Sequence, residues 1–214
     1  MMDALNTLNM KNELNHFMIG ASYGGNQEWF SNFMMRLGGC AAETACDSSV
    51  YFAREKGITE AYPYDAQHLT RREYVDFSRI MEPYLRPRRS GIDRLDIFID
   101  GYGQYLKDRG IDSIAMTGLD GNCPAAEARE AIISQIDKGL PVPVLLLRHK
   151  NRKFKDYNWH WFLINGYKTL DKNHTLVKAV TYSEYQWLLL EDLWNTGFDR
   201  KGGLILYDIK DSQS

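Results

Sequence analysis

The fold is decided by the stretch Gly24-Gly25-Asn26-Gln27-Glu28-Trp29-Phe30, followed closely by Gly38-Gly39-Cys40-Ala41-Ala42-Glu43-Thr44-Ala45-Cys46. Paired glycines allow the backbone to turn sharply. Small and apolar residues recur at helical spacing from Cys40 onward, and Gly57 supplies a stop. The pattern predicts a buried central helix whose first residue is a cysteine.

A thiol at this place has a specific chemical meaning. The first turn of a helix presents unpaired N–H groups and the positive end of the helix dipole, which favour an anion. A free cysteine has a pKa of about 8.5, and a helix N-terminus with a nearby imidazolium can lower it to roughly 3.5–7.5. Cys40 is therefore a candidate nucleophile. The alternative is a cysteine that only fills space in the core.

Composition predicts one globular domain, residues 1–214, with an N-terminal arm of about residues 1–20. The chain has 44% apolar and 25% charged residues and a formal net charge of −2, which are ordinary values for such a domain. The one dense basic run, Arg86-Pro87-Arg88-Arg89, is short. We therefore expect no nucleic-acid partner.

The cysteines and the N-terminus indicate a cytoplasmic protein. Three cysteines do not make a disulfide framework. The first residues lack the basic start and continuous apolar segment of a secretory signal, although a leader that has been removed stays open as an alternative. No run approaches the roughly 20 apolar residues of a membrane helix, so we expect no membrane partner.

Periodicity and turn residues predict an α+β chain. Thr70 is a helix cap supported by Glu73 three residues later. Four apolar residues are expected to pack beneath the loop that carries Gln27: Phe33, Met34, Met35 and Leu37. The predicted helices are 40–56, 71–85, 92–106 and 125–138. The predicted strands are 114–116, 140–147, one beginning at His160, 176–182 and 203–209. Residues 17–20 are either a short strand or an arm that packs on the body, and residues 188–194 are either helical or extended.

A histidine and two further cysteines complete the set of candidates. His160 begins a buried strand between bulky aromatic residues, where a histidine is either a hydrogen-bonded core residue or a base. Cys46 lies on the core-facing side of the central helix and is expected to be inert. Cys123 precedes the helix 125–138 and stays open as a second nucleophile. A thiol, an upstream amide and an imidazole together suit acyl transfer through a thioester.

Four short motifs, at 24–30, 38–40, 138–144 and 160–167, resemble those of the papain-like cysteine peptidases. They are most similar to free-standing bacterial relatives of the peptidases that cut bacteriocin leaders after a double glycine. The resemblance spans residues 20–207. It implies an α+β fold in which the cysteine begins a central helix packed against an antiparallel sheet. It also implies Cys40 as nucleophile, His160 as base, and Gln27 with the Cys40 N–H as the oxyanion hole.

The chain departs from that family in two places. Ala41-Ala42 follows the cysteine where relatives commonly have glycine and proline. Relatives orient the histidine with Asp, Asn or sometimes Ser after the next strand, whereas this chain reads Val180-Thr181-Tyr182-Ser183-Glu184. Thr181 is the first choice for the orienting residue and Ser183 the second, because both are expected on one face of the strand and both can accept from an imidazole N–H.

The resulting prediction is a thiol hydrolase that acts on a peptide or protein substrate, or on another amide. No metal or organic cofactor is expected, since well-spaced metal ligands are lacking and His16, His149 and His174 lie in polar runs expected to face solvent. Two alternatives stay open. One is a transglutaminase-like acyl transferase, and the other is an inactive papain-like module that binds a peptide in the former cleft.

Overall fold

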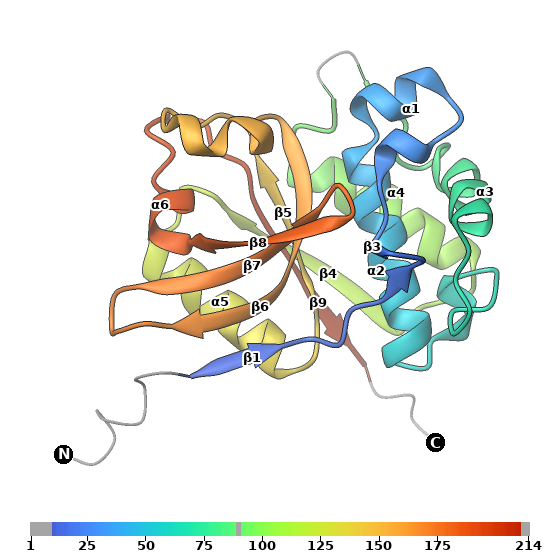
Figure 1. Ribbon diagram of the computed structural model, residues 1–214, viewed down its shortest axis with the longest axis horizontal. Helices are drawn as coiled ribbons and strands as arrows, with labels where there is room; N and C mark the ends of the chain where they lie inside the picture. Colours follow the sequence, from blue (N-terminus) through green and yellow to red (C-terminus); the bar gives the residue numbers. More distant parts are fainter. Residues whose placement is uncertain (1–9, 89–90, 211–214) are drawn as a thin grey trace.

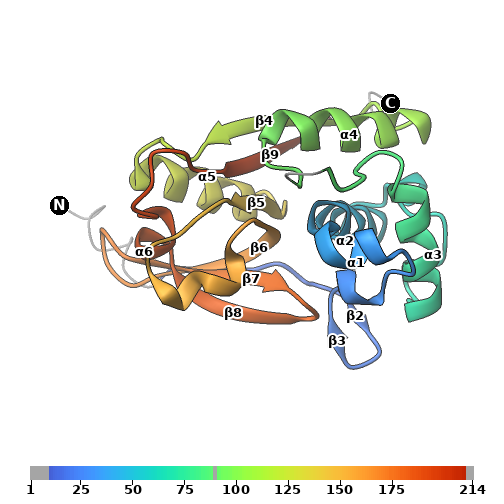
Figure 2. The same cartoon turned by 90° about the horizontal axis from the view of Figure 1, so that it is seen from above.

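The computed structural model describes residues 10–88 and 91–210, which fold into a main antiparallel sheet, a small separate hairpin and a group of helices (Figure 1). This arrangement confirms the α+β prediction. Figure 2 shows α1, α2 and α3 grouped beside the sheet. The helices of the described residues are α1 (Phe33–Gly38), α2 (Cys40–Glu55), α3 (Arg71–Met81), α4 (Leu95–Asp108), α5 (Ala125–Asp137) and α6 (Leu190–Trp194), with short 3-10 turns η1 (Gln27–Trp29), η2 (Thr59–Ala61) and η3 (Arg152–Tyr157).

Within the described residues, seven strands form the main sheet, in the order β4-β9-β5-β6-β7-β8, and β1 also pairs with β6. All of these pairings are antiparallel. A separate two-stranded hairpin, β2–β3, precedes η1. The strands are β1 (Lys11–Glu13), β2 (Met18–Ile19), β3 (Ser22–Tyr23), β4 (Ile114–Asp120), β5 (Val142–Leu146), β6 (His160–Thr169), β7 (Thr175–Thr181), β8 (Glu184–Leu189) and β9 (Gly203–Ile209).

Helix α2 lies at the centre of the structure, because small side chains on its surface let neighbouring elements come close. Every residue from 40 to 53 is buried, and α2 packs against both β6 and α3. Large aromatic residues from other elements fill the space that the small residues leave. The Tyr207 hydroxyl donates to Ser48 at 3.0 Å, and the hydroxyls of Ser49 and Tyr102 are 2.9 Å apart. The helix that carries Cys40 is therefore held on several sides.

The structure corrects several predicted boundaries. Helix α3 ends at Met81 instead of residue 85, since Pro83 follows closely, and α4 begins at Leu95 instead of residue 92. The sequence patterns did not predict α1, η3 or strand β8. Phe33, Met34 and Leu37 of α1 are 65%, 51% and 70% exposed, so the expectation that they pack beneath the Gln27 loop is wrong; only Met35 of that run is buried.

Candidate active site

Cys40 is the first residue of α2. The preceding glycine makes the junction with α1 possible: the Gly39 N–H donates to the Met35 carbonyl at 2.8 Å, and a Cβ atom on Gly39 would lie 2.3 Å from that oxygen. Only glycine fits this close approach. The Gly38-Gly39-Cys40 sequence thus ends one helix and begins the next with a thiol at its tip.

Gln27 reaches the same region from η1. Its Nε2 donates to the carbonyl of Arg36 at 2.9 Å. That contact fixes the orientation of the amide, because only the nitrogen side can donate to a carbonyl. One Nε2 hydrogen is used by Arg36 and a second hydrogen is left. Gln27 is buried except for the part that lines the cleft described below.

His160 is the first residue of β6 and pairs with Leu146 of β5. Its Nε2 lies 2.7 Å from the Thr181 hydroxyl at the end of β7. The register explains this contact. Leu163 pairs with Val180, so Thr181 falls opposite Phe162, which is two residues from His160 and on the same face of β6. With Nε2 engaged, Nδ1 is the nitrogen that can face Cys40.

The structure distinguishes Thr181 from Ser183. Thr181 is the last residue of β7, whereas Tyr182 and Ser183 form a tight turn with φ values of 53° and 64°. Ser183 bonds the carbonyl of Gly25 through its N–H at 2.9 Å and its hydroxyl at 3.3 Å. The prediction that both residues share a strand face is therefore wrong, and Thr181 is the one that contacts the imidazole.

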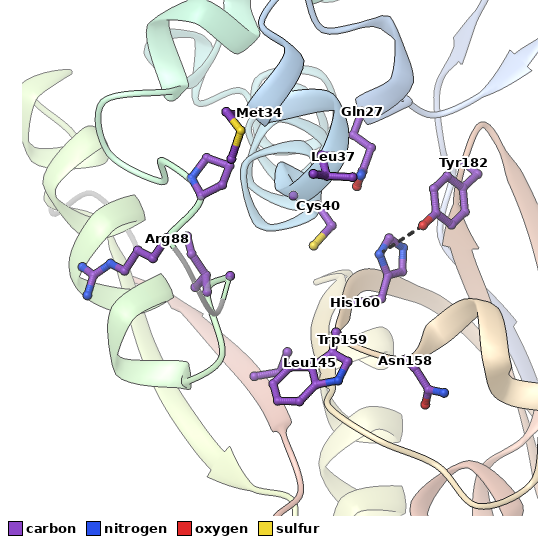
Figure 3. A pocket seen from close by; sticks show the side chains of 14 residues that line it. Gln27, Met34, Leu37, Cys40, Arg88, Leu145, Asn158, Trp159, His160 and Tyr182 are labelled. Atoms are coloured by element: carbon purple, nitrogen blue, oxygen red, sulfur yellow. Dashed lines mark hydrogen bonds between the residues drawn. The ribbon is translucent and has the colours of Figure 1, made fainter.

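Cys40 and His160 line the same cleft, which has a volume of about 930 Å³. Figure 3 shows the Cys40 sulfur pointing into this cleft beside the His160 ring, with the Gln27 amide on the same side. The structure thus brings Cys40, His160 and Gln27 together at one cleft, and Thr181 contacts His160. Apolar side chains make up most of the other walls: Met34, Leu37, Ile92, Leu145 and Trp159.

The charge state of the site differs from the sequence-based expectation. Burial raises the pKa of the Cys40 thiol to about 11, although the N–H groups of Trp161, Ala41 and Cys40 itself act in the opposite direction. Burial also lowers the pKa of His160 to about 4. Desolvation outweighs the helix terminus, and both shifts oppose a thiolate–imidazolium pair in the free site. At neutral pH the site holds a neutral thiol beside a neutral base.

The other two cysteines lie outside the cleft. Cys46 is fully buried in the core, in agreement with its predicted place on the inner side of α2. Cys123 is half-buried before α5, and burial raises the pKa of its thiol. Pro124 is the residue at the N-terminal cap of α5. Cys40 is the cysteine with an imidazole and an opening beside it.

The remaining histidines only partly follow the prediction. His174 is exposed, as expected, but His16 and His149 are 9% and 8% exposed, so their predicted solvent-facing positions are wrong. His149 bonds the Asp192 carbonyl and the Asn151 N–H, at 2.8 and 2.9 Å. Among the described residues, no group of three or more His, Cys, Asp and Glu side chains could hold a metal ion.

Two features of the site were missed in the sequence. Tyr182 lies against the His160 ring, with 4.7 Å between ring centroids. Glu43 and Asp47 are buried one and two turns along α2 from Cys40, and burial raises the pKa of both carboxyl groups. The four-residue spacing of these two carboxylates in an otherwise small and apolar helix was the available signal for this second group.

Comparisons with known proteins identify no family. No family model matches the chain, and no curated protein matches it. Among solved structures, the Pseudomonas avirulence protein AvrPphB is similar, with a TM-score of 0.36 and 9% sequence identity over 84% of this chain and 94% of that chain. A similarity this low carries no argument about this chain. In the described residues, no helix has both the length and the apolar character needed to cross a membrane.

Proposed function

We propose that this protein is a papain-like thiol hydrolase that cleaves peptide bonds through a thioester on Cys40. One observation carries the proposal: a thiol at the first residue of α2 and an imidazole at the first residue of β6 line the same cleft, and Thr181 engages the far nitrogen of the imidazole. The packing of α2 against β6 of an antiparallel sheet suits that fold class. The finer resemblance to double-glycine peptidases stays a prediction.

The groups present can perform each step. His160 Nδ1 takes the proton of the Cys40 thiol as the sulfur attacks the substrate carbonyl carbon. The negative oxygen that forms accepts hydrogen bonds from the second Gln27 Nε2 hydrogen and from the Cys40 N–H, which has no partner within its own helix. The C–N bond then breaks, and the leaving amine receives the proton from His160.

The second half of the reaction reverses these roles. Water attacks the thioester while His160 takes one of its protons. The carbon–sulfur bond breaks, Cys40 recovers a proton from His160, and the new carboxylic acid leaves. No step needs a permanent ion pair, because the proton moves only when the carbonyl is in place. The neutral resting pair therefore suits this mechanism.

The walls of the cleft favour an apolar side chain next to the bond that is cut. Met34, Leu37 and Trp159 line the cleft yet are 51%, 70% and 46% exposed. Large apolar side chains exposed together around a concave site gain stability when a ligand covers them. The expected substrate is a peptide with a large aliphatic or aromatic residue beside the scissile bond.

A mixture of unstructured peptides tests the proposal. Incubation followed by mass spectrometry should yield fragments with free carboxylates, cut beside large apolar residues, and a peptidyl epoxide should modify Cys40. Cys40→Ser is the control and should yield neither. Bound but uncut peptides would instead identify a binding module. Products joined to an added amine, with no free acid, would identify an acyl transferase.

A further inference from the structure

Tyr182 has an unusual backbone conformation for its side chain. It is the first residue of the two-residue turn between β7 and β8, and its φ is 53°. Asn and Gly suit this left-handed region, whereas a bulky aromatic residue is strained there. Strained residues that persist at a cleft often hold something in place. Tyr182 is also common to the main cleft and to a neighbouring pocket lined by Thr181.

The Tyr182 side chain lies flat on the imidazole of His160. The two rings are 4.7 Å apart between centroids and inclined by 4°. The Tyr182 hydroxyl lies 3.4 Å from His160 Nδ1, which Figure 3 marks with a dashed line. Thr181 lies 2.7 Å from the other nitrogen. Both nitrogens and one face of the imidazole are therefore in contact with residues 181 and 182, and His160 is 3% exposed.

From these contacts we infer that Tyr182 is a positioning residue for His160. Its ring covers the imidazole, keeps water away from it and holds Nδ1 in place for the Cys40 proton. This inference rests on the proposed function. It adds a second contact to the one that Thr181 makes, so the ring of the base is held both at its edge and on its face.

The Tyr182 hydroxyl does not block the base. Because the two rings are nearly parallel, the hydroxyl lies over the face of the imidazole near Nδ1. The lone pair of Nδ1 lies in the plane of the ring and stays available for the Cys40 proton. Burial raises the pKa of Tyr182 to about 12, helped by the nearby groups Cys40, Glu43, Glu28 and Asp156, so this hydroxyl keeps its proton at neutral pH.

The burial of the His160 ring beneath Tyr182 is consistent with the low pKa of this histidine. Burial is the cause of the lowered pKa of His160, about 4 in place of 6.5. Stacking on an aromatic face would favour the cation and raise that value. Loss of water around the ring acts in the opposite direction and lowers the pKa. Removing the cover should therefore raise the pKa of His160.

The test is a pH titration of the histidine rings by NMR with nitrogen-labelled protein, in the absence of substrate. The His160 signals are assigned from their loss in His160→Gln. Tyr182→Asn and Tyr182→Gly suit the left-handed turn and uncover the ring, and using both means that the result does not depend on the folding of one variant. Tyr182→Phe keeps the cover without the hydroxyl. Ser183→Asn is the matched control at the neighbouring left-handed position.

Wild-type protein and Ser183→Asn should show the same low midpoint. Tyr182→Asn and Tyr182→Gly should raise the midpoint by about one pH unit or more. Tyr182→Phe keeps the cover and should keep the midpoint within about half a unit of wild type. An unchanged midpoint in both uncovered variants would overturn the inference. Failure of wild-type protein to cleave peptides, with these shifts present, would count against the proposed function instead.

Discussion

Two buried groups of polar residues lie along helix α2, and they differ in whether they contain a nucleophile at an open cleft. The tip site consists of Cys40, Gln27, His160 and Thr181. The flank cluster consists of His16, Glu43, Asp47 and Tyr74, and lies further along the same helix. Each contains a histidine whose pKa is lowered by burial, to about 4 for His160 and to about 3 for His16. A shifted histidine pKa therefore does not by itself identify an active site in this protein.

Surroundings separate the two imidazoles. His160 has Thr181 on one nitrogen and lines a cleft together with a thiol. His16 lies between the rings of Phe17 and Tyr23, with centroids 4.5 and 4.9 Å away, and neither of its nitrogens has a hydrogen-bond partner among the described residues. Its nearest carboxylate oxygen, on Asp47, is 3.9 Å away. A nucleophile and an opening to substrate mark the tip site; the flank cluster has neither.

The largest expected contrast is between the two thiols of α2. Cys40→Ser should lower peptide hydrolysis by about a thousandfold or more, because the attacking sulfur is lost. Cys46→Ser should leave the rate of hydrolysis unchanged and lower the free energy of unfolding by about 1–3 kcal/mol, since it buries a hydroxyl in the core. Initial rates and urea unfolding measure both. Equal loss of hydrolysis in the two variants would remove the distinction.

The two histidines should show the same contrast: replacing His160 should lower the rate of hydrolysis, and replacing His16 should not. His160→Leu should lower hydrolysis by about a hundredfold to ten-thousandfold through loss of the base. His16→Leu should keep the wild-type rate and raise the free energy of unfolding by about 1 kcal/mol, because it replaces a buried imidazole whose nitrogens are unpaired. The same assays measure both. A large loss of activity in His16→Leu would show that the flank cluster takes part in catalysis.

A substitution of Gln27 tests whether its amide donates to the negative oxygen at the tip site. Gln27→Leu removes one donor to the negative oxygen and should lower kcat by about a hundredfold with little change in KM. Glu28→Gln, at an exposed position in the same turn, is the control and should keep the wild-type kcat. Steady-state kinetics with a cleaved peptide separate the two constants. A change confined to KM would assign Gln27 to substrate binding.

Substitutions in the flank cluster should change the free energy of unfolding and leave the rate of hydrolysis unchanged. Burial raises the pKa of Asp47 to about 7, above its unfolded value of 3.8. Such a carboxyl stabilises the fold below its unfolded pKa, and this contribution is lost as pH rises through the folded value. Asp47→Asn keeps an oxygen for the Gly25 N–H and the Tyr74 hydroxyl. It should raise the free energy of unfolding by about 1–3 kcal/mol at pH 8 and change it little at pH 4.

Denaturant unfolding at the two pH values measures this effect, with exposed Asp112→Asn as the control. His16 acts with the opposite sign, because its folded pKa lies below its unfolded value of 6.5. Its contribution is present above pH 6.5 and is lost as pH falls toward about 3. A stability gain in Asp47→Asn that is equal at both pH values would contradict the buried-carboxyl account.

Local patterns predicted the parts of the structure that depend on local chemistry. Paired glycines and small residues predicted where α2 begins, and Thr70 caps α3 as expected, accepting from the Glu73 N–H at 3.2 Å. Burial depends on distant contacts and was harder to predict. His16 lies in a polar run yet is covered by α2 and the β2–β3 hairpin region.

The pKa shifts of Cys40 and His160 could not be predicted from the sequence for the same reason. A helix N-terminus can be predicted from its residues, and its effect on Cys40 has the expected sign. The larger effect is desolvation, which depends on how β6 and the β7–β8 turn pack over the thiol and the imidazole. The two-residue turn that separates Thr181 from Ser183 likewise depends on the pairing of β7 with β8.

The pH dependence of Cys40 alkylation tests the central claim most directly. Native protein is treated with iodoacetamide between about pH 5 and pH 9, and the rate at Cys40 is followed by peptide mapping. With a pKa of about 11 for the thiol and about 4 for the imidazole, the thiolate fraction in the free site follows the ionisation of the thiol and rises about tenfold per pH unit across this range. The alkylation rate at Cys40 should therefore rise about tenfold per pH unit without a plateau, in wild-type protein and in His160→Leu alike. A wild-type rate that levels off below about pH 7, with the plateau lost in His160→Leu, would show a thiolate–imidazolium pair in the free site and contradict the account.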